Sequence, residues 1–117
     1  MWSERESYIS SLEEIEEYLK EIDYFHDYRI GNIHYSNNQS VITVEEIIKT
    51  NDNTDDTGLI WDFKFEAVQN FEINCDCVVG YYINEITIEG NKIIFNCDNG
   101  TITVDASHVQ LGVPKIH

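Results

Sequence analysis

A change in hydrophobic periodicity near Tyr28 is the feature that most constrains the fold of this chain. Before it, apolar residues recur at three- and four-residue steps over residues 9–22, which places them on one face of a helix. After it, apolar and polar residues alternate with the two-residue period of strands. The change predicts one N-terminal amphipathic helix followed by a sheet.

The expected helix carries start and stop signals. Ser10 with Glu13, or Ser11 with Glu14, can form a capping box, and the helix dipole favours negative charge in the first turns. The helix is expected to end within residues 23–27. Its apolar stripe is expected to lie on the sheet.

The remainder of the chain indicates about six antiparallel strands between turn signals. Trp61, Phe63 and Phe65 alternate with charged residues and mark the clearest strand. Glu45–Ile48 is expected to form a bulge or a short helical turn, and Asn99-Gly100 is a hairpin signal. The candidate strands are residues 28–35, 40–49, 59–66, 68–78, 82–89, 92–97 and 101–105.

Two segments are expected to lie outside the strands, namely a polar loop over residues 51–58 and an edge or coil tail over residues 107–117. No linker or repeat divides the 117 residues. We therefore expect a single α+β domain spanning residues 1–117, in which the helix packs on an antiparallel β-meander of about six strands.

The charge restricts the classes of partner. The chain has 22 acidic and seven basic residues, a net charge of −15. Such a surface repels nucleic acid and anionic lipid and attracts basic partners. The N-terminus does not resemble a secretory signal, and no apolar run approaches the roughly 20 residues that cross a bilayer. Three cysteines are few and odd in number, so we expect a cytoplasmic protein with reduced thiols.

The cysteines are the first candidates for a metal site. Cys75 and Cys77 lie two residues apart on an expected strand, and Cys97 could lie on a neighbouring one. Structural zinc sites use two cysteines on a turning backbone more often than an extended pair. We expect core cysteines and no cofactor, with a zinc site as the alternative.

Catalytic motifs are weak in this sequence. His26-Asp27 is similar to the metal-binding pair of the HD phosphohydrolases, but that family is mostly helical, so a capping or hydrogen-bonded His26 at the helix-to-strand junction is expected. The loop over residues 51–58 lacks the register of an EF-hand. The chain has no nucleophile elbow and no phosphate-binding glycine loop. We therefore do not expect an enzyme.

Negative charge is concentrated near the helix. Nine acidic and two basic residues precede Tyr28, a net charge of −7, and the other 90 residues carry −8. The glutamates lie mostly off the apolar stripe and form a solvent-facing ridge. The ridge is either an ordinary solvated helix face or a docking surface for a basic protein, for which Glu13, Glu17 and Glu21 are the candidate contacts.

The layout resembles a known class of protein. An acidic helix, the junction Phe25-His26-Asp27 and a meander with a hairpin at residues 86–92 are similar to small bacterial immunity-type proteins that accompany polymorphic toxins. The resemblance implies a cytoplasmic inhibitor that covers the active site of a basic toxin. Aromatic anchors inside the acidic rim would be Tyr24, Tyr81 and Tyr82. One alternative is a self-associating module that forms a homodimer through a strand edge or the face of Trp61.

Overall fold

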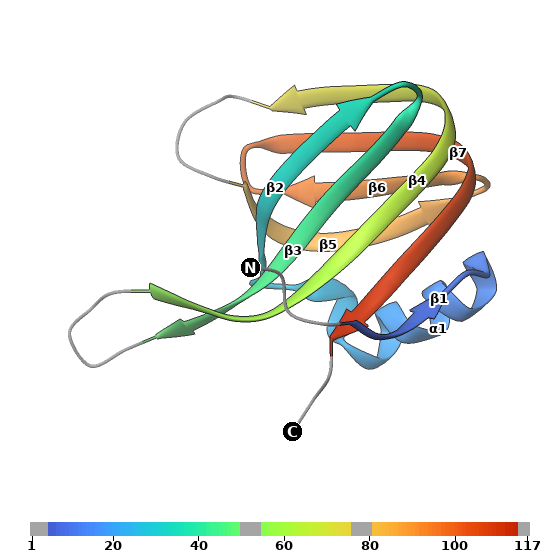
Figure 1. Ribbon diagram of the computed structural model, residues 1–117. Coiled ribbons are helices and arrows are strands. Elements are labelled where there is room, and N and C mark those ends of the chain that lie inside the picture. Colours follow the sequence, from blue (N-terminus) through green and yellow to red (C-terminus); the bar gives the residue numbers. More distant parts are fainter. Residues whose placement is uncertain (1–4, 50–54, 76–80, 115–117) are drawn as a thin grey trace.

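Strands dominate the architecture. The computed structural model describes residues 5–49, 55–75 and 81–114, and these ranges contain seven strands, one α-helix and one short 3-10 turn, η1 (Figure 1). The elements are β1 (Arg5–Ile9), α1 (Leu12–Glu21), η1 (Asp23–Phe25), β2 (Arg29–Ser36), β3 (Gln39–Lys49), β4 (Asp55–Cys75), β5 (Tyr81–Glu89), β6 (Lys92–Cys97) and β7 (Gly100–Pro114).

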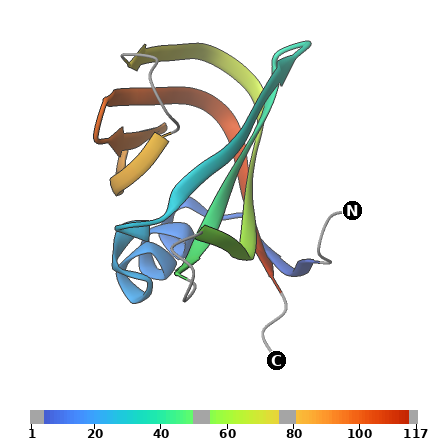
Figure 2. The ribbon, with the colours of Figure 1, turned by 90° about the vertical axis from the view of Figure 1, so that its left-hand side faces the viewer.

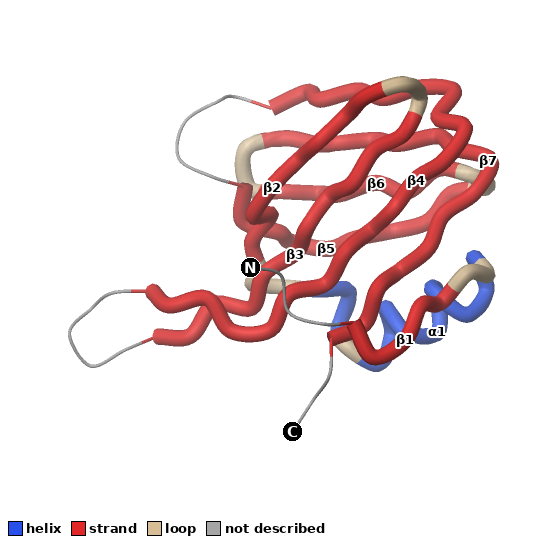
Figure 3. The backbone as a smooth tube through the Cα atoms, in the orientation of Figure 1, coloured by secondary structure: helices blue, strands red, loops and turns tan. Residues whose placement is uncertain are grey.

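The sheet closes on itself. Its strand order is β1-β7-β4-β3-β2-β5-β6, every pairing is antiparallel, and β7 also pairs with β6 (Figure 3). The mostly β chain with one helix fits the expected α+β class at this coarse level. The expected meander is wrong at one step, because β4 is followed by β5 in the chain but pairs with β3 and β7.

Two long strands bend from one part of the sheet into the other. β4 runs through 21 residues, with Ala67 in the left-handed region at φ 53° and a register shift between Val68 and Asn70. The expected strands 59–66 and 68–78 are therefore one strand over their described residues, because a bulge turns a strand without ending it. Cys75 is the last described residue of β4.

The structure of the C-terminal residues also differs from the expectation. Residues 107–114 belong to β7 and lie between β4 and β1, not in an edge or coil. β1 was not expected, because its five residues are too few to reveal a period. The expected polar loop is corrected in part, since residues 55–58 belong to β4 and residues 51–54 lie outside the described ranges.

The core contains the aromatic residues that the alternating pattern of residues 59–66 placed on one face of the strand. Trp61, Phe63 and Phe65 are at most 2% exposed, and Phe63 contacts Phe95 edge-on at 5.2 Å between ring centroids. Asp62 on the opposite face is also buried, at 7% exposure, where charge was expected to face solvent. Its register partners on the neighbouring strands are Thr43, which is also buried, and Gly112.

The helix is held by its cap and by the core. Ser11 is the N-cap, and its Oγ accepts a hydrogen bond from the Glu14 amide at 3.4 Å. Ile15 and Leu19 are at most 1% exposed and join the sheet's core cluster. A ten-residue helix is marginal alone, so this packing stabilises it. The helix lies across one end of the closed sheet (Figure 2).

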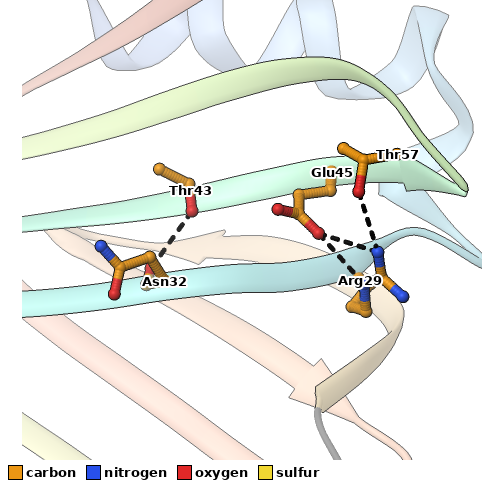
Figure 4. A network of polar contacts seen from close by, with 5 residues as sticks. All are labelled: Arg29, Asn32, Thr43, Glu45 and Thr57. Atoms are coloured by element: carbon orange, nitrogen blue, oxygen red, sulfur yellow. Dashed lines mark hydrogen bonds and ion pairs between the residues drawn. The ribbon is translucent and has the colours of Figure 1, made fainter. Parts of the chain in front are cut away.

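A two-stranded arm extends from the closed sheet, formed by the end of β3 and the start of β4 (Figure 1). Its base contains the bulge expected over Glu45–Ile48, seen as a register shift between Glu45 and Ile47. There Arg29 donates to Glu45 at 3.0 and 3.1 Å and to Thr57 at 3.2 Å (Figure 4). Both members of the ion pair are about one-fifth exposed, so the contact is better shielded from water than a surface pair.

Within the part of the chain that the structure describes, no helix combines the length and apolar character needed to cross a bilayer.

Candidate functional site

The acidic ridge of α1 is exposed along its length. Glu13 and Glu17 border an open groove of about 290 Å³ together with Glu14 and Glu16. Glu17 lies 3.7 Å from the Lys20 ammonium, and both side chains are more than half exposed. A pair this exposed contributes little to stability, so the face remains available for a charged partner.

Glu21 completes the expected acidic set at the end of α1, where it is exposed. Its charge acts on the neighbouring core, because burial first and the Glu21 carboxylate second raise the pKa of Tyr18, against the hydrogen bond from Trp61.

The three expected tyrosine anchors differ in exposure. Tyr24 and Tyr81 are half-buried and pack against the core cluster. Tyr82 is 37% exposed. Tyr82 therefore presents the most accessible ring of the three to a partner.

Tyr82 borders a concave site that we call the junction pocket. It has a volume of about 320 Å³ and lies where the base of the arm, the start of β5 and two turns meet. Its lining comes from Ile47 and Lys49 of β3, residues 82–84 of β5, Asp27 before β2, and Asp98 between β6 and β7. Four separate chain segments therefore contribute to the pocket.

Backbone hydrogen bonds fix both aspartates against β5. The amide of Asp27 donates to the carbonyl of Ile83 at 3.0 Å, and the amide of Asp98 donates to the carbonyl of Tyr82 at 3.0 Å. The Ile83 amide donates in turn to Tyr28 at 2.8 Å. The backbones of two aspartates are thus anchored to consecutive residues of one strand, next to the exposed Tyr82.

The turn that leads to Asp27 is strained. Asp23, Tyr24 and Phe25 have φ of 54°, 56° and 59°, and Asp27 has φ of 70°. The left-handed region costs a non-glycine residue roughly 1 kcal/mol or more. The fully buried Phe25 offsets this cost, because its ring contacts Trp61 at 5.2 Å between centroids.

His26 links this turn to β5. Its Nδ1 lies 2.9 Å from the carbonyl oxygen of Asn84, and its Nε2 lies 3.5 Å from Asp27 Oδ1. The expectation of a hydrogen-bonded His26 at the junction is confirmed. The hydrogen bond to Asn84 and then the charge of Asp27 raise the pKa of His26, with smaller contributions from Asp23 and Asp98.

A second depression, of about 310 Å³, is lined partly by Ser10, Lys64, Glu66 and His108. Lys64 Nζ stands 4.9 Å from the centroid of the Tyr8 ring. Its lining carries both signs of charge on exposed or half-exposed side chains. This depression lacks the bias toward carboxylates that distinguishes the junction pocket.

The cysteines do not converge along the backbone. Cys75 and Cys97 both pair with Gly100, on opposite sides of β7, so two strand spacings of about 4.8 Å each separate them. Cys97 is buried in the core, and Cys77 lies outside the described residues. Among described residues, no group of three or more His, Cys, Asp or Glu side chains is placed to hold a metal ion.

Comparisons of the chain with protein-family models, with curated proteins and with solved structures found no match.

Sequence reasoning identified Tyr82 but not the pocket around it. Asp98 directly precedes the Asn99-Gly100 hairpin signal and Asp27 belongs to the expected helix-to-strand junction, yet nothing local indicated that both would lie against β5. Lys49 and Asn84 carried no functional signal at all. The pocket arises from the closure of the sheet, which brings these segments together.

Proposed function

We propose that this protein is an acidic binding domain that docks a basic protein partner, in the manner of an immunity-type inhibitor of a toxin. The observation that carries the proposal is the exposed ridge of α1, where Glu13, Glu14, Glu16 and Glu17 border one groove. Four carboxylates within two helical turns repel one another. A basic partner would relieve that repulsion.

The charge of the whole chain supports the same proposal. A net charge of −15 accelerates encounter with a basic protein through long-range attraction. A toxin that binds nucleic acid carries a basic surface, and an acidic inhibitor can occupy that surface as a mimic of the phosphates. A cytoplasmic location would place such an inhibitor where a nuclease acts.

The Trp61 face does not support the self-association alternative. Trp61 is 2% exposed, and its indole N–H donates to the Tyr18 hydroxyl at 2.8 Å. That face is therefore covered within one chain. We therefore propose that binding a different, basic protein is the principal function.

The test measures association kinetics with the captured partner. Proteins retained from the native cell at low salt and released at high salt are identified, purified and assayed by surface plasmon resonance. We expect the association rate to fall steeply with ionic strength, and the triple variant Glu13→Lys, Glu17→Lys, Glu21→Lys to lower it about tenfold or more.

A matched control separates local docking from overall charge. The variant Glu66→Lys, Glu72→Lys, Glu85→Lys changes the net charge equally at exposed positions outside α1. It should affect the rate far less than the helix variant. Equal effects of the two variants, or no effect of either, would contradict docking through the ridge.

A further inference from the structure

The junction pocket offers a negatively charged cavity beside an aromatic ring. Asp27 and Asp98 contribute two carboxylates to its lining, and Lys49 contributes one positive charge. The lining thus stays net negative. Asp23 stands nearby, since its charge acts on His26 together with those of Asp27 and Asp98.

The shape of the pocket favours a flat cation. Tyr82 is 37% exposed and lines the pocket together with Ile47, which is apolar and half-buried. The face of an aromatic ring attracts a cation held over it, and guanidinium stacks there more readily than ammonium. A volume of about 320 Å³ at the small end of ligand cavities suits one long side chain.

The backbone turns that carry the two carboxylates are preorganised, while the Asp27 carboxylate itself is 86% exposed and lies 3.5 Å from His26 Nε2. Their backbones are hydrogen-bonded to Tyr82 and Ile83, so neither turn must be ordered when a ligand arrives. A guanidinium group has five N–H donors in a planar fork and can donate to more than one oxygen. Asn84 is exposed and also lines the pocket.

We propose that the junction pocket binds the side chain of a single arginine presented by the protein's basic partner. This inference rests on the proposed function for the identity of the partner, but the pocket itself can be tested without any partner. The arginine would lie along Tyr82, with its guanidinium donating to Asp27 and Asp98. A lysine would reach the carboxylates but would lose the planar stacking.

The experiment titrates the full-length ¹⁵N-labelled protein with N-acetyl-arginine methylamide and follows backbone amide shifts by NMR. We expect saturable shifts at residues 27, 82–84 and 98, with a dissociation constant on the order of millimolar for one side chain. The citrulline analogue has the same shape without the charge and should not saturate. The lysine analogue should bind more weakly than arginine.

Variants assign the binding to named groups. Asp98→Asn should weaken arginine binding about threefold or more, while Glu72→Gln, an exposed acid on β4, should leave it unchanged. Tyr82→Phe should retain binding and Tyr82→Leu should lose most of it, because only the former keeps the ring. Native dispersion of each spectrum confirms that the variant is folded.

Three results would overturn the proposal: shifts spread equally over the α1 glutamates, equal binding of the citrulline analogue, or no change on Asp98→Asn. The test is independent of the helix ridge. If arginine binds in the pocket and the α1 charge reversals leave the partner affinity intact, docking through the ridge is rejected and the pocket proposal stands. If those reversals abolish partner association and arginine does not bind, the pocket proposal is rejected and docking through the ridge stands.

Discussion

The Trp61 indole N–H donates a hydrogen bond of 2.8 Å to the Tyr18 hydroxyl, and this contact joins α1 to the middle of β4. Trp61 is 2% exposed and belongs to the core, while Tyr18 is half-buried and packs against it. The bond therefore connects the acidic ridge to the closed sheet, and it identifies the contact whose loss should loosen the helix.

Tyr18→Phe should destabilise the protein by about 1–3 kcal/mol, because the buried Trp61 N–H would lose its acceptor while the ring packing is kept. The free energy of unfolding in urea measures the change. Tyr35→Phe, at a 46% exposed position, is the control and should alter stability by less than about 0.5 kcal/mol. Equal effects of the two variants would show that the hydrogen bond adds nothing.

Gly31→Ala should destabilise the protein by about 1–2 kcal/mol, because a Cβ at residue 31 would overlap the Glu45 side chain and displace it from Arg29. The substitution should cost much less in a Glu45→Ala background, where nothing remains to overlap. A double-mutant cycle of unfolding free energies measures this coupling.

Gly90→Ala provides the matched control for that cycle. It has open space around its Cβ position but a φ of 62°, so its cost comes from backbone strain alone. That cost should be the same with or without Glu45. Coupling of Glu45 to Gly90 as strong as to Gly31 would refute the steric explanation.

Ala67→Gly should stabilise the protein by about 0.5–1 kcal/mol. Ala67 is exposed and holds φ 53° at the bend of β4, so glycine relieves strain without losing packing. Ala106→Gly, at a position 7% exposed and outside the left-handed region, should destabilise instead. Thermal unfolding of both variants measures the difference, and destabilisation by Ala67→Gly would show that the bend is not strained.

His26 should titrate above its ordinary pKa of about 6.5, chiefly because of its hydrogen bond to the Asn84 carbonyl and then because of Asp27. A raised pKa in the folded state means that protonated His26 favours folding. This stabilisation is fully present below about pH 6.5 and is lost as the pH rises through the folded-state pKa. The free energy of unfolding in urea is measured for the wild type and for His26→Gln across this pH range. The difference between the two proteins isolates the effect of His26.

The contribution of Asp27 to that shift can be measured separately. Asp27→Asn should lower the His26 pKa, and Asp56→Asn, an exposed change on the arm, should leave it in place. An NMR titration of the imidazole protons measures both. An unchanged His26 pKa in Asp27→Asn would show that the Asp27 charge does not act on His26.

Much of the local structure was predictable from the sequence. The helical stripe placed Ile15 and Leu19 in the core, Ser11 marked the N-cap, and alternation placed Trp61 and Phe63 on the buried face. The hairpin marked by Asn99-Gly100 also formed, with its turn between β6 and β7. These signals are local because capping, turn chemistry and the burial of one face are set by neighbours in the chain.

The sequence by itself therefore determined where the helix lies, where most of the central strands lie and which of their faces is aromatic. Only the tertiary structure decided that β4 and β7 bend through the closed sheet, that residues 107–114 lie inside it, and that Asp27 and Asp98 meet at β5. The physical reason is that strand edges of any sequence present the same backbone donors and acceptors. Which edges pair, and hence which turns come together as a site, depends on the closure of the whole sheet.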